Sequence, residues 1–350
     1  MNRAILKKIK MTAAFLLAFF MLAGCGETEM PGETESEPAE EGVTIGMSFD
    51  SFLIERWQRD RDIFVQTAKD LGAEVNVQNA NGDIEEQKKQ IRYLIDKGVD
   101  VIVVVCIDSD SLTDVVKEAK DAGIKVIAYD RLINNADVDL YVSFDNEKVG
   151  TLMGKSLISK GIGGGKVIVI GGSMQDNNVH LVEDGFEKVM SDNRVEIIGT
   201  THCDGWRSEL ASEYLYDNPD LLNECDAIMC GNDNIASQVV NVLSVQRRAG
   251  DILVTGQDAD LEACQRIVEG TQVMTVYKPV EKLARCAAEC AVMLAEGEEI
   301  TGYDVIVTDN GFREVPYVNL EPVMVTKDNM DETIISSGFH THDEVYLNVK

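Results

Sequence analysis

The chain has 350 residues and a formal net charge of −29 at pH 7. This length leaves room for two domains of ordinary size. Because phosphate binding needs clustered lysine and arginine, a chain this acidic is not expected to bind nucleic acid.

The N-terminal segment has the pattern of an export signal. Arg3 and three lysines precede an apolar run over residues 11–24, which is too short to span a membrane comfortably. The run ends in Leu-Ala-Gly-Cys at residues 22–25, which resembles the bacterial lipobox. The resemblance implies cleavage before Cys25 and lipidation of its thiol, which would anchor the protein to the extracytoplasmic face of the cell membrane. The alternative is an ordinary cleaved signal in which Cys25 has no special role.

Residues 1–24 are therefore predicted to be a lipoprotein signal peptide, and residues 25–42 a lipidated cysteine with a disordered acidic linker. Residues 26–42 hold seven glutamates, two prolines and no basic residue. Such a segment cannot bury enough apolar surface to fold. Loss of residues 1–24 would remove four positive charges and no negative ones, which takes the net charge from −29 to −33.

From residue 43, short β-branched runs alternate with longer amphipathic ones, which predicts parallel strands connected by helices. The first set of predicted strands covers residues 43–49, 73–78, 99–106 and 124–129. The predicted helices between them cover residues 55–71, 84–97 and 112–122. The run at 99–106 is apolar on both faces, as is typical of a central parallel strand.

The same alternation then restarts. Further strands are predicted at residues 166–170, 195–201, 226–230 and 252–255, with helices near 179–190, 208–216 and 234–247. Two such sets predict an α/β fold with two doubly wound, Rossmann-like lobes. A strand at 272–277, a helix at 280–295 and a strand at 305–307 follow, and this leftover unit could return to the first lobe. Residues 311–350 show only short extended pieces.

The cysteines do not form an obvious framework. Seven would remain besides Cys25, and an odd number argues against complete pairing. Cys286 and Cys290 lie four residues apart, as on one helical face, and Cys225 and Cys230 flank a short apolar run. There is no CxxC pair and there are only four histidines, so we expect no metal site and interpret most cysteines as small buried apolar residues. An oxidising exterior would still permit one or two disulfides.

Polar side chains follow most of the predicted strands, where ligands bind in open parallel sheets. They accompany the only two tryptophans of the chain. A sugar needs this mixture, because its hydroxyls donate and accept hydrogen bonds while its C–H faces lie on indole rings. Single residues have other interpretations. Asp130 and Arg131 could form a surface ion pair, and an aspartate after a strand is often a helix N-cap, as we expect for Asp233 and Asp260.

Several long segments of the chain, in order, resemble the D-xylose-binding proteins of bacterial ABC importers, which belong to the ribose/galactose type of periplasmic binding protein. The segments include residues 55–64 (ERWQRDRDIF), 128–131 (AYDR), 143–150 (SFDNEKVG), 256–261 (GQDADL), 270–279 (GTQVMTVYKP) and 338–340 (GFH). The resemblance implies the type I periplasmic binding protein fold, in which two lobes are joined by a hinge of three crossings. The first lobe would comprise residues 43–144 plus about 278–306, and the second residues 145–277 plus about 307–350.

The resemblance also implies a function. The protein would be a monomer without a cofactor that captures a monosaccharide, most simply D-xylose, and delivers it to an ABC transporter permease. Asp145 and Asn146 would lie closer to the first hinge crossing than to the ligand, and the alignment at 176–178 could slip by one residue. The implied sugar-binding residues are Arg56, Trp57, Asp130, Arg131, Asp176, Asn178, Trp206, Asn232, Asp258 and Lys278.

Three other functions are alternatives to sugar capture for transport. The same bound form could instead be sensed by a membrane receptor or histidine kinase. An enzyme is not expected, because the chain has no G-x-S-x-G or H-E-x-x-H motif, and the glycine-rich run at 161–166 precedes a strand instead of following one. A transcription regulator would need a basic helix-turn-helix headpiece, and an export pattern stands in its place.

Overall fold

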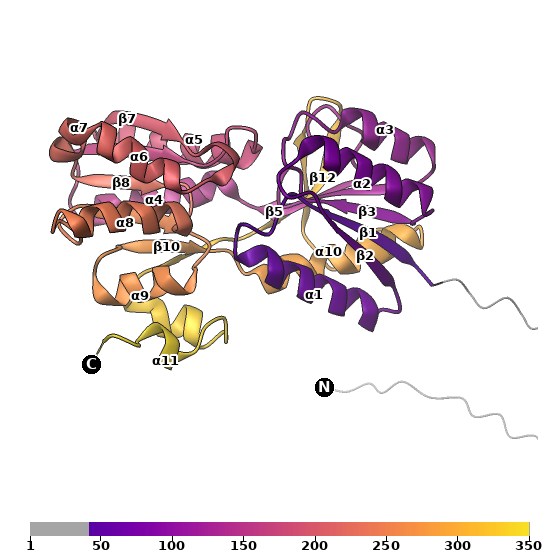
Figure 1. The fold of residues 1–350 in the computed structure, drawn as a ribbon. Helices are drawn as coiled ribbons and strands as arrows, with labels where there is room; N and C mark the ends of the chain where they lie inside the picture. Colours follow the sequence, from indigo (N-terminus) through magenta and orange to yellow (C-terminus); the bar gives the residue numbers. More distant parts are fainter. Residues whose placement is uncertain (1–41, 350) are drawn as a thin grey trace, which may run out of the picture. The chain divides into compact units, whose positions relative to one another are not determined.

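The computed structural model describes residues 42–349 of the chain, so the predicted signal peptide, Cys25 and nearly all of the acidic linker lie outside the described residues. The described part is one compact unit that contains two sheets, each covered by helices on both faces (Figure 1). None of its helices combines the length and the apolar character needed to cross a membrane.

The first sheet has seven strands in the order β11-β12-β5-β4-β3-β1-β2, and all neighbours are parallel except β11 and β12. Helices α1 (Arg56–Asp70) and α10 (Val280–Ala295) pack on one face, and α2 (Ile84–Asp96) and α3 (Thr113–Asp121) on the other. The strands are β1 (Thr44–Phe49), β2 (Glu74–Asn79), β3 (Val101–Val104), β4 (Lys125–Tyr129), β5 (Leu140–Phe144), β11 (Val305–Asp309) and β12 (Glu314–Leu320).

The second sheet has six strands in the order β13-β10-β9-β8-β6-β7, and only β13 is antiparallel. Its strands are β6 (Lys166–Gly171), β7 (Glu196–His202), β8 (Ala227–Cys230), β9 (Leu253–Gln257), β10 (Met274–Tyr277) and β13 (Val323–Val325). Helices α4 (Asn146–Ser159) and α5 (Asn177–Asp192) cover one face. The other face carries α6 (Glu209–Asp217), α7 (Pro219–Glu224) and α8 (Asp233–Val245). Helices α9 (Leu261–Glu269) and α11 (His342–Val345) pack beside β10 and β13.

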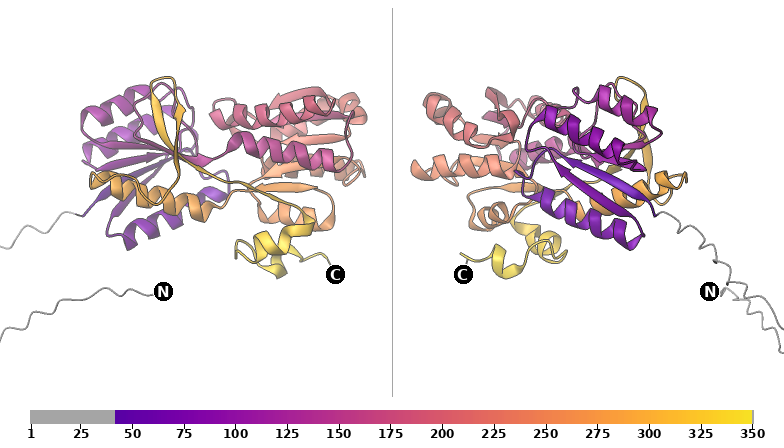
Figure 2. Two further views of the ribbon diagram at one scale, coloured as in Figure 1. Left: turned by 180° about the vertical axis from the view of Figure 1, so that it is seen from behind. Right: turned by 45° about the vertical axis from the view of Figure 1, so that its right-hand side comes forward.

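The predicted architecture of two doubly wound α/β lobes is confirmed, and the chain passes between the two sheets three times (Figure 2). The crossings lie between β5 and α4, between β10 and α10, and between β12 and β13. Helix α10, at residues 280–295, packs against α1 in the first lobe.

The predicted position of the third crossing is wrong. We expected residues from about 307 onward in the second lobe, but β12 pairs with β5 in the first sheet, where Val318 lies opposite Val142. The chain therefore leaves the first sheet only after Leu320. A short β-branched run indicates a strand without indicating which sheet edge it joins, because pairing depends on tertiary neighbours.

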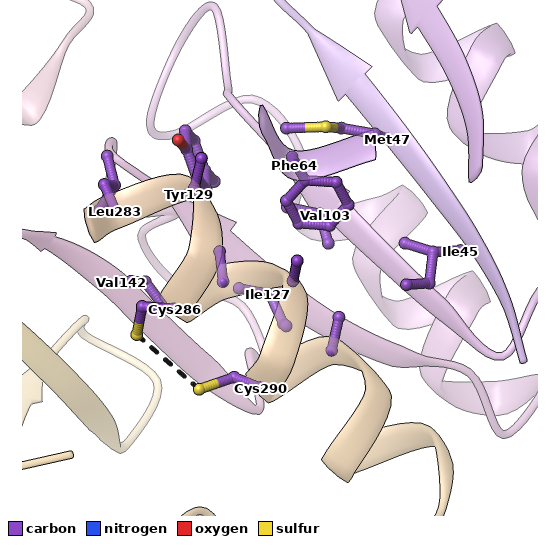
Figure 3. Packing of buried hydrophobic residues seen from close by; sticks show 14 of the residues in the cluster. Ile45, Met47, Phe64, Val103, Ile127, Tyr129, Val142, Leu283, Cys286 and Cys290 are labelled. Carbon is purple, nitrogen blue, oxygen red and sulfur yellow. Dashed lines mark hydrogen bonds between the residues drawn. The ribbon is translucent and has the colours of Figure 1, made fainter. Parts of the chain in front are cut away.

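Helix α10 completes the core of the first lobe. Figure 3 shows Leu283, Cys286 and Cys290 of this helix facing side chains of the sheet such as Ile127 and Val142. The sulfur atoms of Cys286 and Cys290 lie 3.9 Å apart on one helical face, as the spacing predicted. All seven cysteines between residues 42 and 349 are free and buried, which confirms their interpretation as small apolar residues.

Candidate functional site

A cavity lies at the carboxyl ends of strands from both sheets. Nine of the ten residues singled out in the sequence line it. They are Arg56, Trp57, Asp130, Arg131, Asp176, Asn178, Trp206, Asp258 and Lys278. Ile54, Asn146 and Gln257 complete the lining. Both lobes contribute to the lining. Helix α1 and the end of β4 belong to the first lobe, whereas the start of α5 and the end of β9 belong to the second.

Arg56 is held by carboxylates from both lobes. It lies in the first turn of α1, where its Nη2 is 3.1 Å from Oδ1 of Asp60, one helical turn away. Its Nη1 lies 3.0 Å from Oδ2 of Asp130 and 3.8 Å from Oδ1 of Asp258. Asp60 also accepts a hydrogen bond from the Tyr129 hydroxyl. Asp60 was not singled out in the sequence, although its i, i+4 spacing from Arg56 was a usable signal.

Arg131 is held in the same way. Its Nε lies 2.7 Å from Oδ2 of Asp176 in the second lobe. Its Nη1 donates to Oδ2 of Asp50 at 2.8 Å and to the Cys106 carbonyl at 2.9 Å. Asp50 follows β1 and was also missed, because nothing in the local sequence distinguishes it from a turn residue. An arginine fully withdrawn from water needs such partners, since an unpaired buried charge is costly.

The pKa values of the carboxylates in the site are shifted in different directions by their surroundings. Burial raises the pKa of Asp176 and of Asp50, and the nearby Arg131 charge only partly opposes this. Burial acts in the same direction on Asp130, but the charge of Arg56, followed by those of Lys278 and Arg131, outweighs it and lowers the pKa of Asp130. Asp130 is therefore the carboxylate whose ionised form the site favours most clearly.

The two tryptophans have different settings. Trp57 is 2% exposed and belongs to the core of the first lobe, whereas Trp206 is half-buried and contacts the apolar clusters of both lobes. The indole of Trp206 lies against Gly172, where a Cβ would come within 2.3 Å of a ring carbon. The guanidinium of Arg131 lies 5.6 Å from the ring centre of Trp57 and 5.9 Å from that of Trp206, within the range of cation–π attraction.

Three lining residues have left-handed backbone conformations, with φ of 63° at Asp130, 59° at Trp206 and 96° at Asp258. Non-glycine residues rarely adopt this region, and such conformations concentrate at functional sites because surrounding contacts must impose them. The Asp130 carbonyl accepts hydrogen bonds from Ser143 Oγ at 2.6 Å and from Tyr141 Oη at 3.0 Å, which supplies part of that restraint.

The two asparagines predicted to bind the sugar, Asn178 and Asn232, have different hydrogen-bonding roles. The side chain of Asn178 connects the lobes: its Oδ1 accepts from Asn146 Nδ2 at 3.0 Å, and its Nδ2 donates to the Asp130 carbonyl at 3.0 Å. Asn146, expected at the hinge and away from the ligand, thus also lines the cavity. Asn232 does not line it. Its Oδ1 instead caps α8 by accepting from the Ile235 amide at 2.9 Å.

The interpretation of Asp233 as a helix cap is wrong. Asp233 is the first residue of α8 and is fully buried, and its carboxylate accepts from Thr275 Oγ1 at 2.8 Å, Gln272 Nε2 at 2.9 Å and the Asp260 amide at 3.1 Å. Asp260 occupies the N-cap position of α9, but its side chain makes no capping hydrogen bond. Both residues belong to a polar network within the second lobe.

A loop of the first lobe meets the second lobe beside the cavity. The Ser109 amide donates to the Gln175 carbonyl at 2.9 Å, and Ser109 Oγ accepts from the Asn177 amide at 3.1 Å. Gln175 Nε2 donates to Oδ2 of Asp108 at 3.3 Å. The two lobes are therefore in contact through backbone groups as well as through the charged side chains of the site.

Comparison with known proteins gives a consistent result. Over 309 residues the chain is 44% identical to the D-xylose-binding periplasmic protein of Haemophilus influenzae, covering 87% of this chain and 92% of that protein. Residues 45–299 match the family model described as a periplasmic binding protein domain. The chain belongs to the sugar-binding periplasmic binding protein family.

Other periplasmic binding proteins agree with this assignment. The chain is 30% identical to the multiple sugar-binding periplasmic receptor ChvE of Rhizobium radiobacter, covering 86% of this chain and 92% of that protein. An ABC transporter solute-binding protein from Clostridium phytofermentans, solved with bound β-D-glucose, superposes with a TM-score of 0.78 at 29% identity, covering 86% of this chain and 99% of that chain. These relatives are solute-binding proteins, which confirms the prediction that the chain is not an enzyme.

Proposed function

We propose that this protein binds D-xylose in the cavity between its lobes and delivers it to an ABC transporter permease. The observation that carries the proposal is the 44% identity along 92% of a relative named for D-xylose binding. We further propose that the protein works as a lipoprotein on the extracytoplasmic face of the cell membrane. The Leu-Ala-Gly-Cys sequence at residues 22–25 supports this location.

The chemistry of the cavity supports a sugar as the ligand. Carboxylates accept hydrogen bonds from sugar hydroxyls, and guanidinium and ammonium groups donate to them. An indole ring offers an apolar face to the C–H groups of a pyranose. The residues proposed to contact the sugar are Arg56, Trp57, Asp130, Arg131, Asp176, Asn178, Trp206, Asn232, Asp258 and Lys278, with Asn232 the least direct because it caps α8.

The charge distribution favours an uncharged sugar. Each of the three lining cations already faces a carboxylate, the partners being Asp60 and Asp130 for Arg56, Asp50 and Asp176 for Arg131, and Asp258 for Lys278. A sugar acid or sugar phosphate would bring a further negative charge into a buried site where no cation is left without a partner. The desolvation of that charge would not be compensated, so anionic sugars should be excluded.

Binding and closure would be coupled without any covalent chemistry. A sugar that contacts residues of both lobes stabilises the arrangement in which the lobes meet. The size of this stabilisation equals the difference between the binding free energies of the sugar for the joined and the separated lobes. Residues from both sheets line the cavity. A permease could then distinguish the sugar-bound form from the sugar-free form by the surface that the two lobes present together.

Isothermal titration calorimetry of the purified protein against D-xylose, L-arabinose, D-ribose, D-glucose and D-xylonate tests the proposal. We expect one site, tightest binding of D-xylose and no measurable binding of D-xylonate. If D-xylose gives no heat while another neutral aldose binds, the sugar class stands and the identity of the sugar is wrong. Tight binding of D-xylonate would contradict the argument from charge.

A second function is favoured by one relative, since the protein named ChvE is described as a receptor. In that case the sugar-bound protein would present D-xylose to a membrane receptor or histidine kinase. Deletion of the gene separates the two functions. Loss of D-xylose uptake indicates transport, whereas intact uptake with loss of a D-xylose-induced transcriptional response indicates sensing.

A further inference from the structure

Gln257 ends strand β9 and was not among the residues singled out for binding, yet it lines the cavity of the site. We propose that its Oε1 accepts a hydrogen bond from one hydroxyl of the bound sugar, and that Gln257 thereby helps to select among neutral sugars. This inference rests on the proposed sugar binding and adds a specificity-determining residue to it.

The orientation of the Gln257 amide follows from its neighbour. The side chain is 5% exposed, and its Nε2 donates to the carbonyl oxygen of Gly231. A carbonyl can only accept, so the nitrogen must be the atom on that side and Oε1 must be the other. Oε1 is buried and has no hydrogen-bond partner among residues 42–349. A buried acceptor without a partner is costly, and a ligand that donates to it removes the cost.

The surroundings indicate which ligand group would fit. Gln257 also lines a small neighbouring pocket, and Trp206 and Asn178 line both the site and this pocket with it. The indole Nε1 of Trp206 is likewise buried without a partner in the described part of the chain. The shared wall therefore offers one unpaired acceptor and one unpaired donor. A hydroxyl is the group that can donate to one and accept from the other.

Position, and not the unpaired oxygen alone, distinguishes Gln257. Gln90 on α2 has a similar bonding pattern, because its Nε2 donates to the Asn79 carbonyl at 3.0 Å and to Glu86 Oε1 at 3.3 Å, while its Oε1 has no partner within the described residues. Gln90 lines neither of the two cavities. It therefore provides a matched control in which the same side chain is lost away from the site.

The test is calorimetry of the wild type, Gln257→Met and Gln90→Met with D-xylose and with analogues in which each hydroxyl in turn is replaced by hydrogen. We expect Gln257→Met to bind D-xylose about tenfold more weakly, as for loss of one buried hydrogen bond. For one analogue, which lacks the hydroxyl that meets Gln257, the wild type and Gln257→Met should have equal affinity. Gln90→Met should match the wild type with every ligand.

If Gln257→Met loses the same affinity for every analogue, Gln257 only supports the loop at Gly231 and the inference is overturned. It is also overturned if Gln257→Met binds D-xylose as tightly as the wild type. Should Gln257→Met fail to fold, a crystal structure of the wild type with D-xylose serves. A sugar hydroxyl within hydrogen-bond distance of Gln257 Oε1 supports the inference, and the absence of a hydroxyl there overturns it. A wild type that binds no sugar of the series contradicts the proposed function itself.

Discussion

Individual side chains of the site are fixed by partners before any ligand is considered. Arg56 and Arg131 are buried and paired with carboxylates of both lobes, so their guanidinium groups are oriented in advance. Preorganisation of this kind lowers the conformational entropy that binding must remove. These ion pairs also make the site sensitive to substitution of residues that do not contact the ligand. Loss of one partner leaves the other charge buried and without compensation.

Trp206 should carry a large share of sugar affinity, because its half-buried indole lies against Gly172 and lines the cavity. We predict that Trp206→Ala weakens D-xylose binding by roughly thirtyfold, or about 2 kcal/mol, as for a central aromatic contact. Calorimetry measures this. Tyr216→Ala, which removes an aromatic side chain that is 58% exposed on α6, should leave the affinity unchanged. Wild-type affinity in Trp206→Ala would exclude Trp206 from the site.

Asp60 should matter for stability. It is fully buried and neutralises Arg56 one turn away. We predict that Asp60→Ala lowers the free energy of unfolding by about 3 kcal/mol, as for removal of one partner from a buried ion pair. Urea denaturation measures it. Asp62→Ala, which removes an exposed carboxylate from the same helix, should change stability by less than about 0.5 kcal/mol. Similar effects of the two substitutions would contradict this role of Asp60.

The carboxyl ends of parallel strands meet at one edge, so strand assignments placed polar residues such as Asp130, Asp258 and Lys278 there. The choice of these residues as sugar contacts came from the family resemblance. It did not include Asp50, Asp60 or Gln257 among the binding residues. The partner of Asp50 is distant in sequence, and the part of Gln257 depends on an unpaired atom that no local pattern reports. For Asp60 the i, i+4 spacing from Arg56 was a usable signal.

At the level of elements, the network around Asp233 ties α8 to α9 and β10, since its carboxylate binds Thr275 Oγ1, Gln272 Nε2 and the Asp260 amide. Arg266 of α9 donates to the Asp233 carbonyl from its Nη2 at 3.2 Å and to Gln272 Oε1 from its Nε at 2.9 Å. Burial raises the pKa of Asp233 to about 7, and the Arg266 charge only partly opposes this shift. Burial, followed by the charge of Asp233, also raises the pKa of Asp260.

This network predicts a pH dependence of stability. Because the pKa of Asp233 is raised from 3.8 to about 7 on folding, its protonated form is favoured in the native state. Its contribution is complete below about pH 4 and is lost as the pH rises to about 7. The free energy of unfolding of the wild type relative to Asp233→Asn should therefore fall over this range, at up to about 1.4 kcal/mol per pH unit. Chemical denaturation at several pH values measures this, and a difference that is constant or rises would contradict the assignment.

Among the elements, long amphipathic helices such as α2 and α10 were predictable because their apolar faces repeat with the helical period. Strand β5 and helix α4 were not predicted. The five residues of β5 are buried on both faces and show no alternation, and α4 is buried along much of its length, including its two glycines. Such segments lack the periodicity on which the prediction depends.

For the whole molecule, hydrogen bonds between the lobes stabilise the joined arrangement, so the loss of one should shift the balance between separated and joined lobes. We predict that Ser109→Ala, which removes the acceptor of the Asn177 amide, weakens D-xylose binding about fivefold, as for one hydrogen bond of about 1 kcal/mol. Ser111→Ala removes a hydroxyl that donates to the Asp108 carbonyl within the first lobe and should have no effect. Calorimetry compares the two variants. Equal effects, or none from Ser109→Ala, would show that this contact does not influence closure.

The two-lobed organisation followed from the restart of the strand and helix alternation near residue 166. The edge pairing of β12 did not, because it depends on the neighbouring strand β5. The most direct test of the whole account is a crystal structure of the protein grown with D-xylose. We predict a single D-xylose molecule between the lobes, in contact with both Trp57 and Trp206. A sugar bound elsewhere, or a cavity without sugar at saturating D-xylose, would contradict it.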